Sequence, residues 1–126
     1  VPSFQEWNLR RARDVVLELR QFVRETMWAE VGLERSAVGL ERARRALDGL
    51  RSRARQADIE TRNLWSLASL VVAAAVARPE SCGCHFRVDG ELDEKPKRKR
   101  WLSYHRGQQM PTLVELHPRP SRRAIA

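Results

Sequence analysis

A run of apolar residues near the middle of the chain places the strongest constraint on its fold. The run extends from Leu64 to Ala77 and is interrupted only by Ser66 and Ser69. Its fourteen residues would rise about 21 Å as an α-helix, which is short of the roughly 30 Å of a bilayer's hydrocarbon core. A helix without a polar face must be covered by more than one neighbour. The run therefore predicts a buried helix at the centre of a bundle.

Two amphipathic segments precede this run and are suited to cover it. We predict one helix from about Glu6 to Met27 or Trp28, ended by Gly32, and a second over about 36–56. In both segments, apolar residues recur at intervals of three and four, which places them on one helix face. The first stripe comprises Leu9, Ala12, Val16, Leu19 and Val23, widened by Val15 and Phe22, and the second comprises Leu40, Ala43, Leu47, Leu50, Ala54 and Ala57.

The predicted fold class is all-α: an antiparallel three-helix bundle, similar to a spectrin repeat, followed by a loop and a short β-hairpin. Ser36 and Asp58 are the expected N-caps of the second and third helices, and Leu67 and Val71 are expected in the core. We assign residues 1–90 to the bundle with its loop. Residues 91–126 are expected to hold a basic linker, the hairpin and a frayed tail.

The hairpin is predicted from two short β-prone runs, Trp101–Tyr104 and Thr112–Leu116, with residues 106–109 between them as a turn. The preceding linker and the last ten residues contain prolines, which favour irregular backbone. The first residue is Val1 rather than Met, which favours a piece of a longer protein.

The net charge of +8 is distributed unevenly along the chain. Residues 1–92 hold 15 Arg and 13 acidic residues, whereas residues 93–126 hold nine basic and three acidic residues. The bundle is thus nearly neutral, which argues against a surface built for nucleic acid. The basic run at 95–100 is expected to be a solvated linker that binds polyanions weakly, without sequence preference and in a salt-sensitive way.

The only two cysteines, Cys82 and Cys84, lie one residue apart and precede His85. Such neighbours rarely meet the geometry of a mutual disulfide, so the chain is expected to be reduced and cytoplasmic. A closed zinc site needs four ligands, and no second ligand pair completes a set. A Cys–His nucleophile lacks an orienting group, and no glycine-rich phosphate loop is present. We therefore assign no catalytic, cofactor-binding or metal-binding residue.

Five short sequence pieces, in order over about residues 15–89, resemble the C-terminal domain of the succinate dehydrogenase, fumarate reductase and L-aspartate oxidase flavoproteins. They are Leu19 to Trp28, Val31-Gly32-Leu33-x-Arg35, Leu40 with 43–50, Glu60-x-Arg62-Asn63-Leu64, and Arg78-x-Glu80-Ser81-x-Gly83-x-His85-Phe86-Arg87-x-Asp89. The last piece is the most specific, because the family usually has Glu-Ser-Arg-Gly-x-His-Tyr-Arg-x-Asp there. Cys82 stands where the family has arginine, so a bidentate donor is lost.

The aromatic residue after His85 resembles L-aspartate oxidase more than succinate dehydrogenase. The resemblance implies a parent enzyme that oxidises L-aspartate to iminoaspartate with FAD in NAD biosynthesis. It places the FAD-binding and catalytic residues in preceding domains, which would be the partners of this chain; the quinolinate synthase step is a further implied partner, and no membrane is implied. The family-motif loop, with a structural and interface role, comprises Ser81, Gly83, His85, Phe86, Arg87 and Asp89.

Two alternatives remain open at this point. The chain could be the equivalent domain of a succinate dehydrogenase or fumarate reductase flavoprotein. It could also be a free-standing, basic, nucleic-acid-binding helical bundle. The coding sequence upstream of Val1 would separate these hypotheses, because only a flavoprotein has a dinucleotide-binding fingerprint there.

Overall fold

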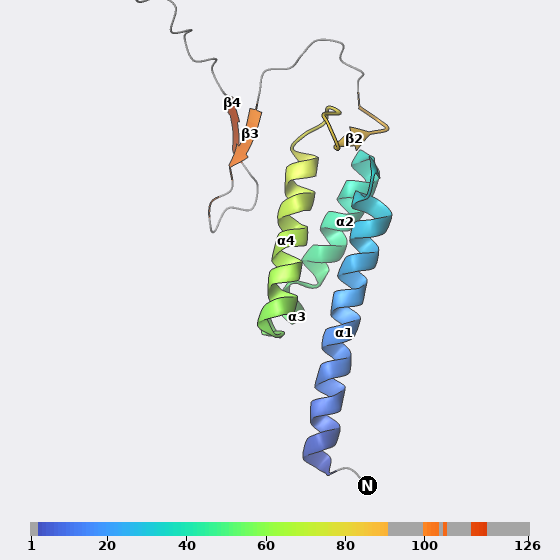
Figure 1. The fold of residues 1–126 in the computed structure, drawn as a ribbon, viewed down its shortest axis with the longest axis vertical. Coiled ribbons are helices and arrows are strands. Elements are labelled where there is room, and N and C mark those ends of the chain that lie inside the picture. Colours follow the sequence, from blue (N-terminus) through green and yellow to red (C-terminus); the bar gives the residue numbers. More distant parts are fainter. Residues whose placement is uncertain (1–2, 91–99, 104, 106–111, 116–126) are drawn as a thin grey trace, which may run out of the picture.

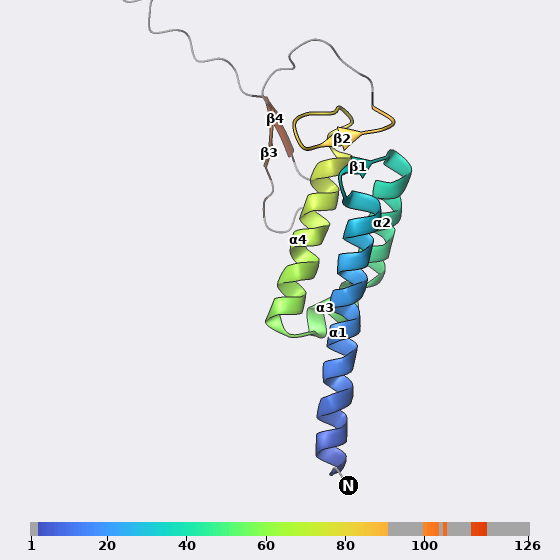
Figure 2. The same cartoon turned by 45° about the vertical axis from the view of Figure 1, so that its right-hand side comes forward.

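A computed structural model of the chain describes residues 3–90, 100–103, 105 and 112–115. Three long helices, α1 (Phe4–Val31), α2 (Ala37–Gly49) and α4 (Ile59–Val76), lie side by side, and consecutive long helices run in opposite directions (Figures 1 and 2). The short helix α3 (Arg51–Gln56) leads from α2 to α4. The predicted all-α bundle is confirmed.

The helix ends follow the predicted caps, with one unexpected break. The side-chain oxygens of Ser36 and Asp58 accept hydrogen bonds from the third residue of each helix, at 3.0 Å in both cases. The predicted helix over 36–56 is divided at Leu50, whose amide donates to the carbonyl of Leu47 at 3.1 Å. This tighter turn follows Gly49, a residue that weakens a helix interior.

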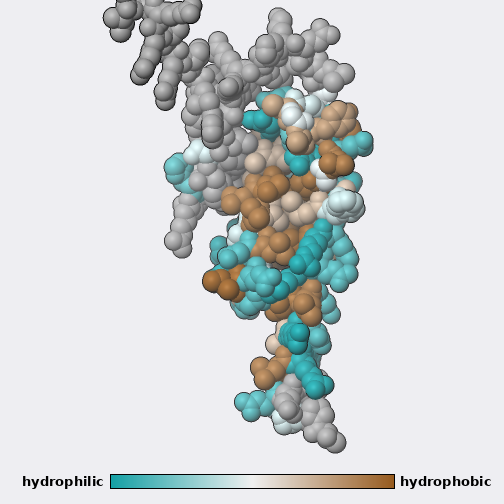
Figure 3. All heavy atoms as spheres, in the orientation of Figure 1, coloured by the Kyte–Doolittle hydropathy of each residue, from teal (hydrophilic) through white to brown (hydrophobic). Residues whose placement is uncertain are grey.

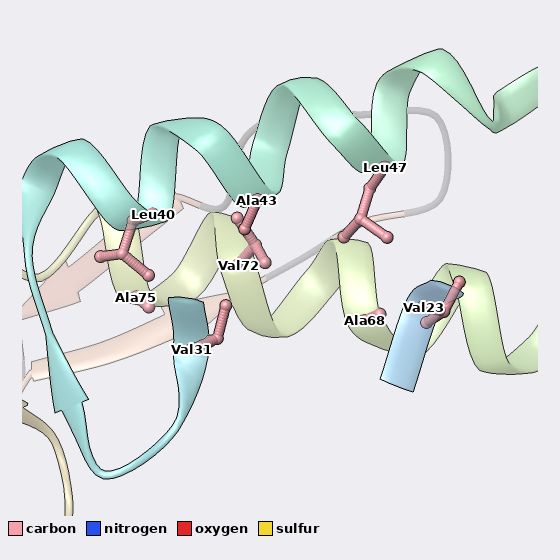
Figure 4. Close-up of a cluster of buried hydrophobic side chains, with 8 residues drawn as sticks. All are labelled: Val23, Val31, Leu40, Ala43, Leu47, Ala68, Val72 and Ala75. Carbon is pink, nitrogen blue, oxygen red and sulfur yellow. The ribbon is translucent and has the colours of Figure 1, made fainter. Parts of the chain in front are cut away.

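The core lies along the inner face of α2. Leu40, Ala43 and Leu47 are almost fully buried and point toward α4 and α1 (Figure 4). The whole cluster comprises Val23, Val31, Leu40, Ala43, Leu47, Ala68, Val72 and Ala75. Ala43 of α2 lies beside Val72 of α4 (Figure 4), and small side chains at such a contact let two helices approach closely.

The prediction that Leu67 and Val71 belong to the core is wrong. Their exposed fractions are 60% and 36%, while their neighbours Ala68 and Val72 are buried. Helix α4 therefore turns the face with Ala68, Val72 and Ala75 into the core and leaves Leu67 and Val71 on its outer face. Figure 3 shows the resulting apolar area over α4.

The N-terminal half of α1 extends beyond the turn between α3 and α4 (Figures 1 and 2). The predicted stripe on α1 is consequently covered only in its later part. Leu19 and Val23 are buried, whereas Leu9, Ala12 and Val15 are exposed. The periodicity was sufficient to predict a helix but not the length of its contact with other helices.

Polar side-chain contacts fix how far α2 and α4 are shifted along α1. On α1, the Arg20 guanidinium donates to Thr61 Oγ1 at 2.7 Å and to Asp58 Oδ1 at 2.8 Å, which fixes the start of α4. Further along, Arg42 and Glu30 form a two-point ion pair, with distances of 3.0 and 2.8 Å, between α2 and α1. Exposed ion pairs contribute little free energy, so these contacts set register rather than supply most of the stability.

Two small sheets complete the described structure. Strands β1 (Glu34–Arg35) and β2 (Phe86–Arg87) pair in parallel, and strands β3 (Arg100–Ser103) and β4 (Thr112–Glu115) form an antiparallel pair. The predicted hairpin strands are confirmed, whereas the predicted turn at 106–109 and most of the linker and tail lie outside the described residues. Within the described part of the chain, no helix combines the length and apolar character needed to cross a bilayer.

The burial pattern generates a first prediction, which contrasts two leucines. Leu47→Ala should lower the free energy of unfolding by about 2–5 kcal/mol, because it opens a cavity in the core. Leu67→Ala should change it by no more than about 0.5 kcal/mol in this chain, because its side chain is exposed. Urea denaturation of both variants measures the difference. Equal losses of stability would contradict the described core.

Candidate functional site

The motif loop, residues 81–89, lies across one end of the bundle. Its strand β2 pairs with β1 in the connection between α1 and α2, and the Val88 amide donates to the Arg35 carbonyl at 2.9 Å. The sequence analysis missed this pairing. Strands of two residues have no periodicity to detect, and the partners lie about fifty residues apart.

A tight turn opens the loop. The backbone groups of Cys82 and His85 bond each other in both directions, at 2.9 and 3.0 Å. Gly83, inside this turn, has a φ of +56°, a conformation that glycine adopts without steric cost. The family motif's glycine therefore has a clear backbone role.

The His85 imidazole is held from both sides. Arg35 Nη1 lies 2.7 Å from its Nδ1, and its Nε2 lies 2.9 Å from the Arg78 carbonyl oxygen. A guanidinium can only donate and a carbonyl can only accept. The ring is therefore neutral, with Nδ1 accepting from Arg35 and the Nε2 proton donated to the carbonyl.

The surroundings of His85 favour this neutral form. Burial lowers its pKa, and the positive charges of Arg35, Arg87 and Arg78 act in the same direction. The bond to the Arg78 carbonyl opposes them without reversing the shift. Protonation would also destroy the acceptor that Arg35 uses. His85 is thus suited to a fixed structural role rather than to proton transfer.

Arg87 and Asp89 connect the loop to the start of α2. The Arg87 guanidinium, with an exposed fraction of 7%, donates to both Asp89 oxygens at 2.8 and 3.1 Å and to the Arg78 carbonyl at 3.3 Å. Asp89 in turn accepts a hydrogen bond from the amide of Ala37, the first residue of α2. Arg87 and this amide lower the pKa of Asp89 to about 2.

Ser81 and Gly90 fix the two ends of the loop. Ser81 Oγ accepts from the Arg87 amide at 2.9 Å, which draws the loop back on itself. At Gly90, an added Cβ would lie 2.8 Å from the Pro79 carbonyl oxygen and 2.9 Å from Arg87 Cβ. Only glycine fits this close approach.

The motif loop and Arg35 together therefore satisfy backbone groups at the ends of three helices. Arg35 Nε donates to the carbonyls of Val31 and Gly32, at 3.2 and 3.1 Å, at the end of α1. His85 and Arg87 reach the carbonyl of Arg78, just after α4, and Asp89 caps α2. The side chain of Phe86, also a predicted loop residue, is exposed instead. The sequence analysis did not include Arg35 in the predicted site, although Arg35 ends the family-like piece Val31-Gly32-Leu33-x-Arg35.

The polar groups of the described motif loop are engaged in hydrogen bonds within the domain. Among the described residues, no group of three His, Cys, Asp or Glu side chains is close enough to hold a metal ion. Both nitrogens of His85 are already engaged, and Gly83 lies in a turn rather than at a helix start, where a pyrophosphate would bind. Two hollows in the described surface lie between α1 and Asp58 and between α1 and α2, and neither is lined by a residue of the motif loop.

Comparisons with known proteins give a matching family model and several similar sequences. Residues 56–113 match the family model for the fumarate reductase flavoprotein C-terminal domain. The chain is 30% identical over 113 residues to L-aspartate oxidase of Acinetobacter baylyi, covering 78% of this chain and 21% of that protein. It is 35% identical over 96 residues to the chloroplastic L-aspartate oxidase of Arabidopsis thaliana, covering 64% and 15%.

A third relative is named a fumarate reductase rather than an L-aspartate oxidase. A fumarate reductase (CoM/CoB) subunit of Methanothermobacter marburgensis is 29% identical over 127 residues, covering 84% of this chain and 23% of that protein. The chain thus spans 15% to 23% of the length of these three relatives. No solved structure matches it.

The fold, the motif loop and these matches define a C-terminal domain of the succinate dehydrogenase and fumarate reductase flavoprotein superfamily, and the chain belongs to it. Within that superfamily, the chain is L-aspartate oxidase-like.

The pKa of Asp89 generates a second prediction. Because folding lowers this pKa from 3.8 to about 2, the ionised carboxylate stabilises the fold above pH 4, and this contribution is lost as the pH falls toward 2. Asp89→Asn should therefore be less stable than the wild type at pH 7. The difference should shrink between about pH 4 and pH 2. Denaturation across this range measures it.

Asp48→Asn provides the matched control, because Asp48 pairs with Arg44 and Arg51 on the exposed side of α2, away from the loop. Its effect at neutral pH should be small, as for other surface ion pairs. An equal loss of stability in both variants at pH 7 would contradict a special role for Asp89.

Proposed function

We propose that the chain is the C-terminal accessory domain of an FAD-dependent L-aspartate oxidase. Its parent enzyme would oxidise L-aspartate to iminoaspartate in NAD biosynthesis. The carrying observation is the motif loop, which occurs in a chain similar to two proteins named L-aspartate oxidase. In this proposal, the domain supplies structure and an interface, and none of its residues is catalytic.

The proposed interface includes the outer face of α4. Leu67 and Val71 expose apolar surface there, while the polar side of a bundle helix would ordinarily face water. Phe86 and Val88, on the motif loop, are also exposed and apolar. These two surfaces are the ones that we assign to contact with the preceding FAD-binding and catalytic domains.

The motif loop would act by holding the interface in shape. His85, Arg87 and Asp89 use their polar atoms to bind helix ends, so little of their chemistry is left for a substrate. FAD and the groups that react with L-aspartate would then lie entirely in the preceding domains. We place the parent enzyme in the cytoplasm, where its product would pass to the quinolinate synthase step.

A second candidate is the corresponding domain of a fumarate reductase flavoprotein. It rests on the similarity to the fumarate reductase (CoM/CoB) subunit of Methanothermobacter marburgensis, which extends over 84% of this chain. The two candidates differ in substrate. The enzyme encoded by the contiguous reading frame should oxidise L-aspartate under the first proposal, and reduce fumarate or oxidise succinate under the second.

A third prediction tests the accessory role in that longer enzyme. His85→Ala and Arg87→Ala should lower the melting temperature by several degrees and reduce the flavin bound per protein, because helix ends lose their partners. Turnover per bound flavin should change little. Thermal unfolding, flavin absorbance and steady-state kinetics measure these three quantities. A large loss of turnover at full flavin occupancy would make the loop catalytic and overturn the proposal.

A fourth prediction separates the interface from the stability of the bundle. Leu67→Lys should leave the unfolding of the 126-residue chain nearly unchanged, because the side chain is exposed there. In the longer enzyme it should lower the melting temperature and flavin retention, because a charge enters an apolar contact. Arg55→Lys, on the exposed side of α3, is the control and should be neutral in both. Equal behaviour of Leu67→Lys and the control would exclude this face of α4 from the interface.

A further inference from the structure

The turn that opens the motif loop carries two thiols. Cys82 and Cys84 are the only cysteines in the sequence, and both are free and exposed. The contacts that anchor the loop come from its other residues. The two thiols are therefore available for chemistry that the structural role of the loop does not use.

The turn gives a reason to reconsider the expectation that cysteines one residue apart rarely pair. In an extended chain, the Cα atoms of residues two apart are separated by about 7 Å. A disulfide requires a Cα separation of roughly 4.4–6.8 Å. The paired hydrogen bonds between Cys82 and His85, together with a φ of +56° at Gly83, fold this segment into a tight turn and bring the two Cα atoms toward that range.

The neighbouring imidazole cannot turn this pair into a metal site. Its Nδ1 accepts from Arg35 and its Nε2 donates to the Arg78 carbonyl, so neither nitrogen offers a lone pair to a metal ion. No set of three potential ligands occurs among the described residues. Two exposed thiols separated by one residue can still undergo reversible oxidation.

We propose that Cys82 and Cys84 form a reversible disulfide, with hydrogen peroxide as the oxidant and a small-molecule thiol as the reductant. One thiolate sulfur attacks a peroxide oxygen, the O–O bond breaks, and hydroxide leaves behind a sulfenic acid. The second thiolate attacks that sulfur, so that the S–S bond forms and the S–O bond breaks, releasing a second hydroxide. The two thiol protons convert both hydroxides to water. The cysteines lose two electrons and the peroxide gains two.

The position of the pair makes the disulfide easy to form and to reverse. Both sulfurs belong to one turn, so the helices need not separate for the bond to close. Exposed disulfides are open to attack by thiols and are typically the labile ones. Two glutathione molecules would restore both cysteines and leave as oxidised glutathione. This proposal is independent of the proposed parent enzyme, because it concerns only this chain.

The test uses the full 126-residue chain, reduced and then treated with one equivalent of hydrogen peroxide. Thiol titration and intact mass should show that both thiols are lost together. The product should be a monomer lighter by two hydrogen atoms, and dithiothreitol should restore it. Cys82→Ser and Cys84→Ser cannot close the bond, so they should give oxygen adducts or dimers instead. A disulfide-linked dimer, or separate oxygen adducts, as the main wild-type product would overturn the proposal.

Two substitutions at Gly83 test the contribution of the turn while leaving both thiols in place. Asn tolerates a positive φ, whereas Val strongly disfavours it. A Cβ added at Gly83 would meet no atom within 4 Å, so the effect of either residue comes from the backbone. The test uses a glutathione buffer in which half of the wild-type protein holds the disulfide. In that buffer the oxidised fraction of Gly83→Asn should also be close to one half. Gly83→Val should lower the equilibrium constant for disulfide formation roughly tenfold. Equal constants for the two variants would show that the turn does not promote the bond.

Discussion

Backbone groups at helix ends need hydrogen-bond partners, and in this bundle the motif loop and Arg35 supply them for three helices. Each helix leaves amides or carbonyls without partners inside the helix, and burial makes such groups costly. Arg35, His85, Arg87 and Asp89 meet this need through side chains from two segments far apart in the sequence. The helices are therefore joined at one end by polar contacts and along their length by apolar ones. The direction of each helix relative to the others depends on both.

The inner and outer faces of α4 explain why this bundle leaves so much apolar surface exposed. Small residues, Ala68 and Ala75, face α2 and allow close packing, while Leu67 faces outward. A bundle with larger residues on that inner face would have wider spacing between its helices. The placement of alanines on the inner face and Leu67 on the outer face thus allows close packing, and it also creates the apolar surface that we assign to neighbouring domains.

Much of the fold could be predicted from the sequence, because helix signals are local. The caps Ser36 and Asp58, the helical periods and the hairpin strands all depend on residues a few positions apart. The inward face of α4 could not be predicted, because an apolar run has no polar side to orient it. The β1–β2 pairing and the role of Arg35 could not be predicted either, because they join positions about fifty residues apart. The motif loop was found through family resemblance, and its geometry came only from the structure.

Insertions and deletions in the N-terminal half of α1 would change the direction in which its side chains point. Helix α1 is continuous from Phe4 to Val31, and its later part is fixed in the bundle through Leu19 and Val23. Each residue of an α-helix turns the chain by about 100° and advances it by about 1.5 Å. One residue added between Leu9 and Leu19 would therefore swing every earlier side chain to another side of the axis, while three or four would nearly restore the direction at a greater distance. Only length changes of about one helical turn would therefore keep these mostly exposed side chains on their present side of the helix axis.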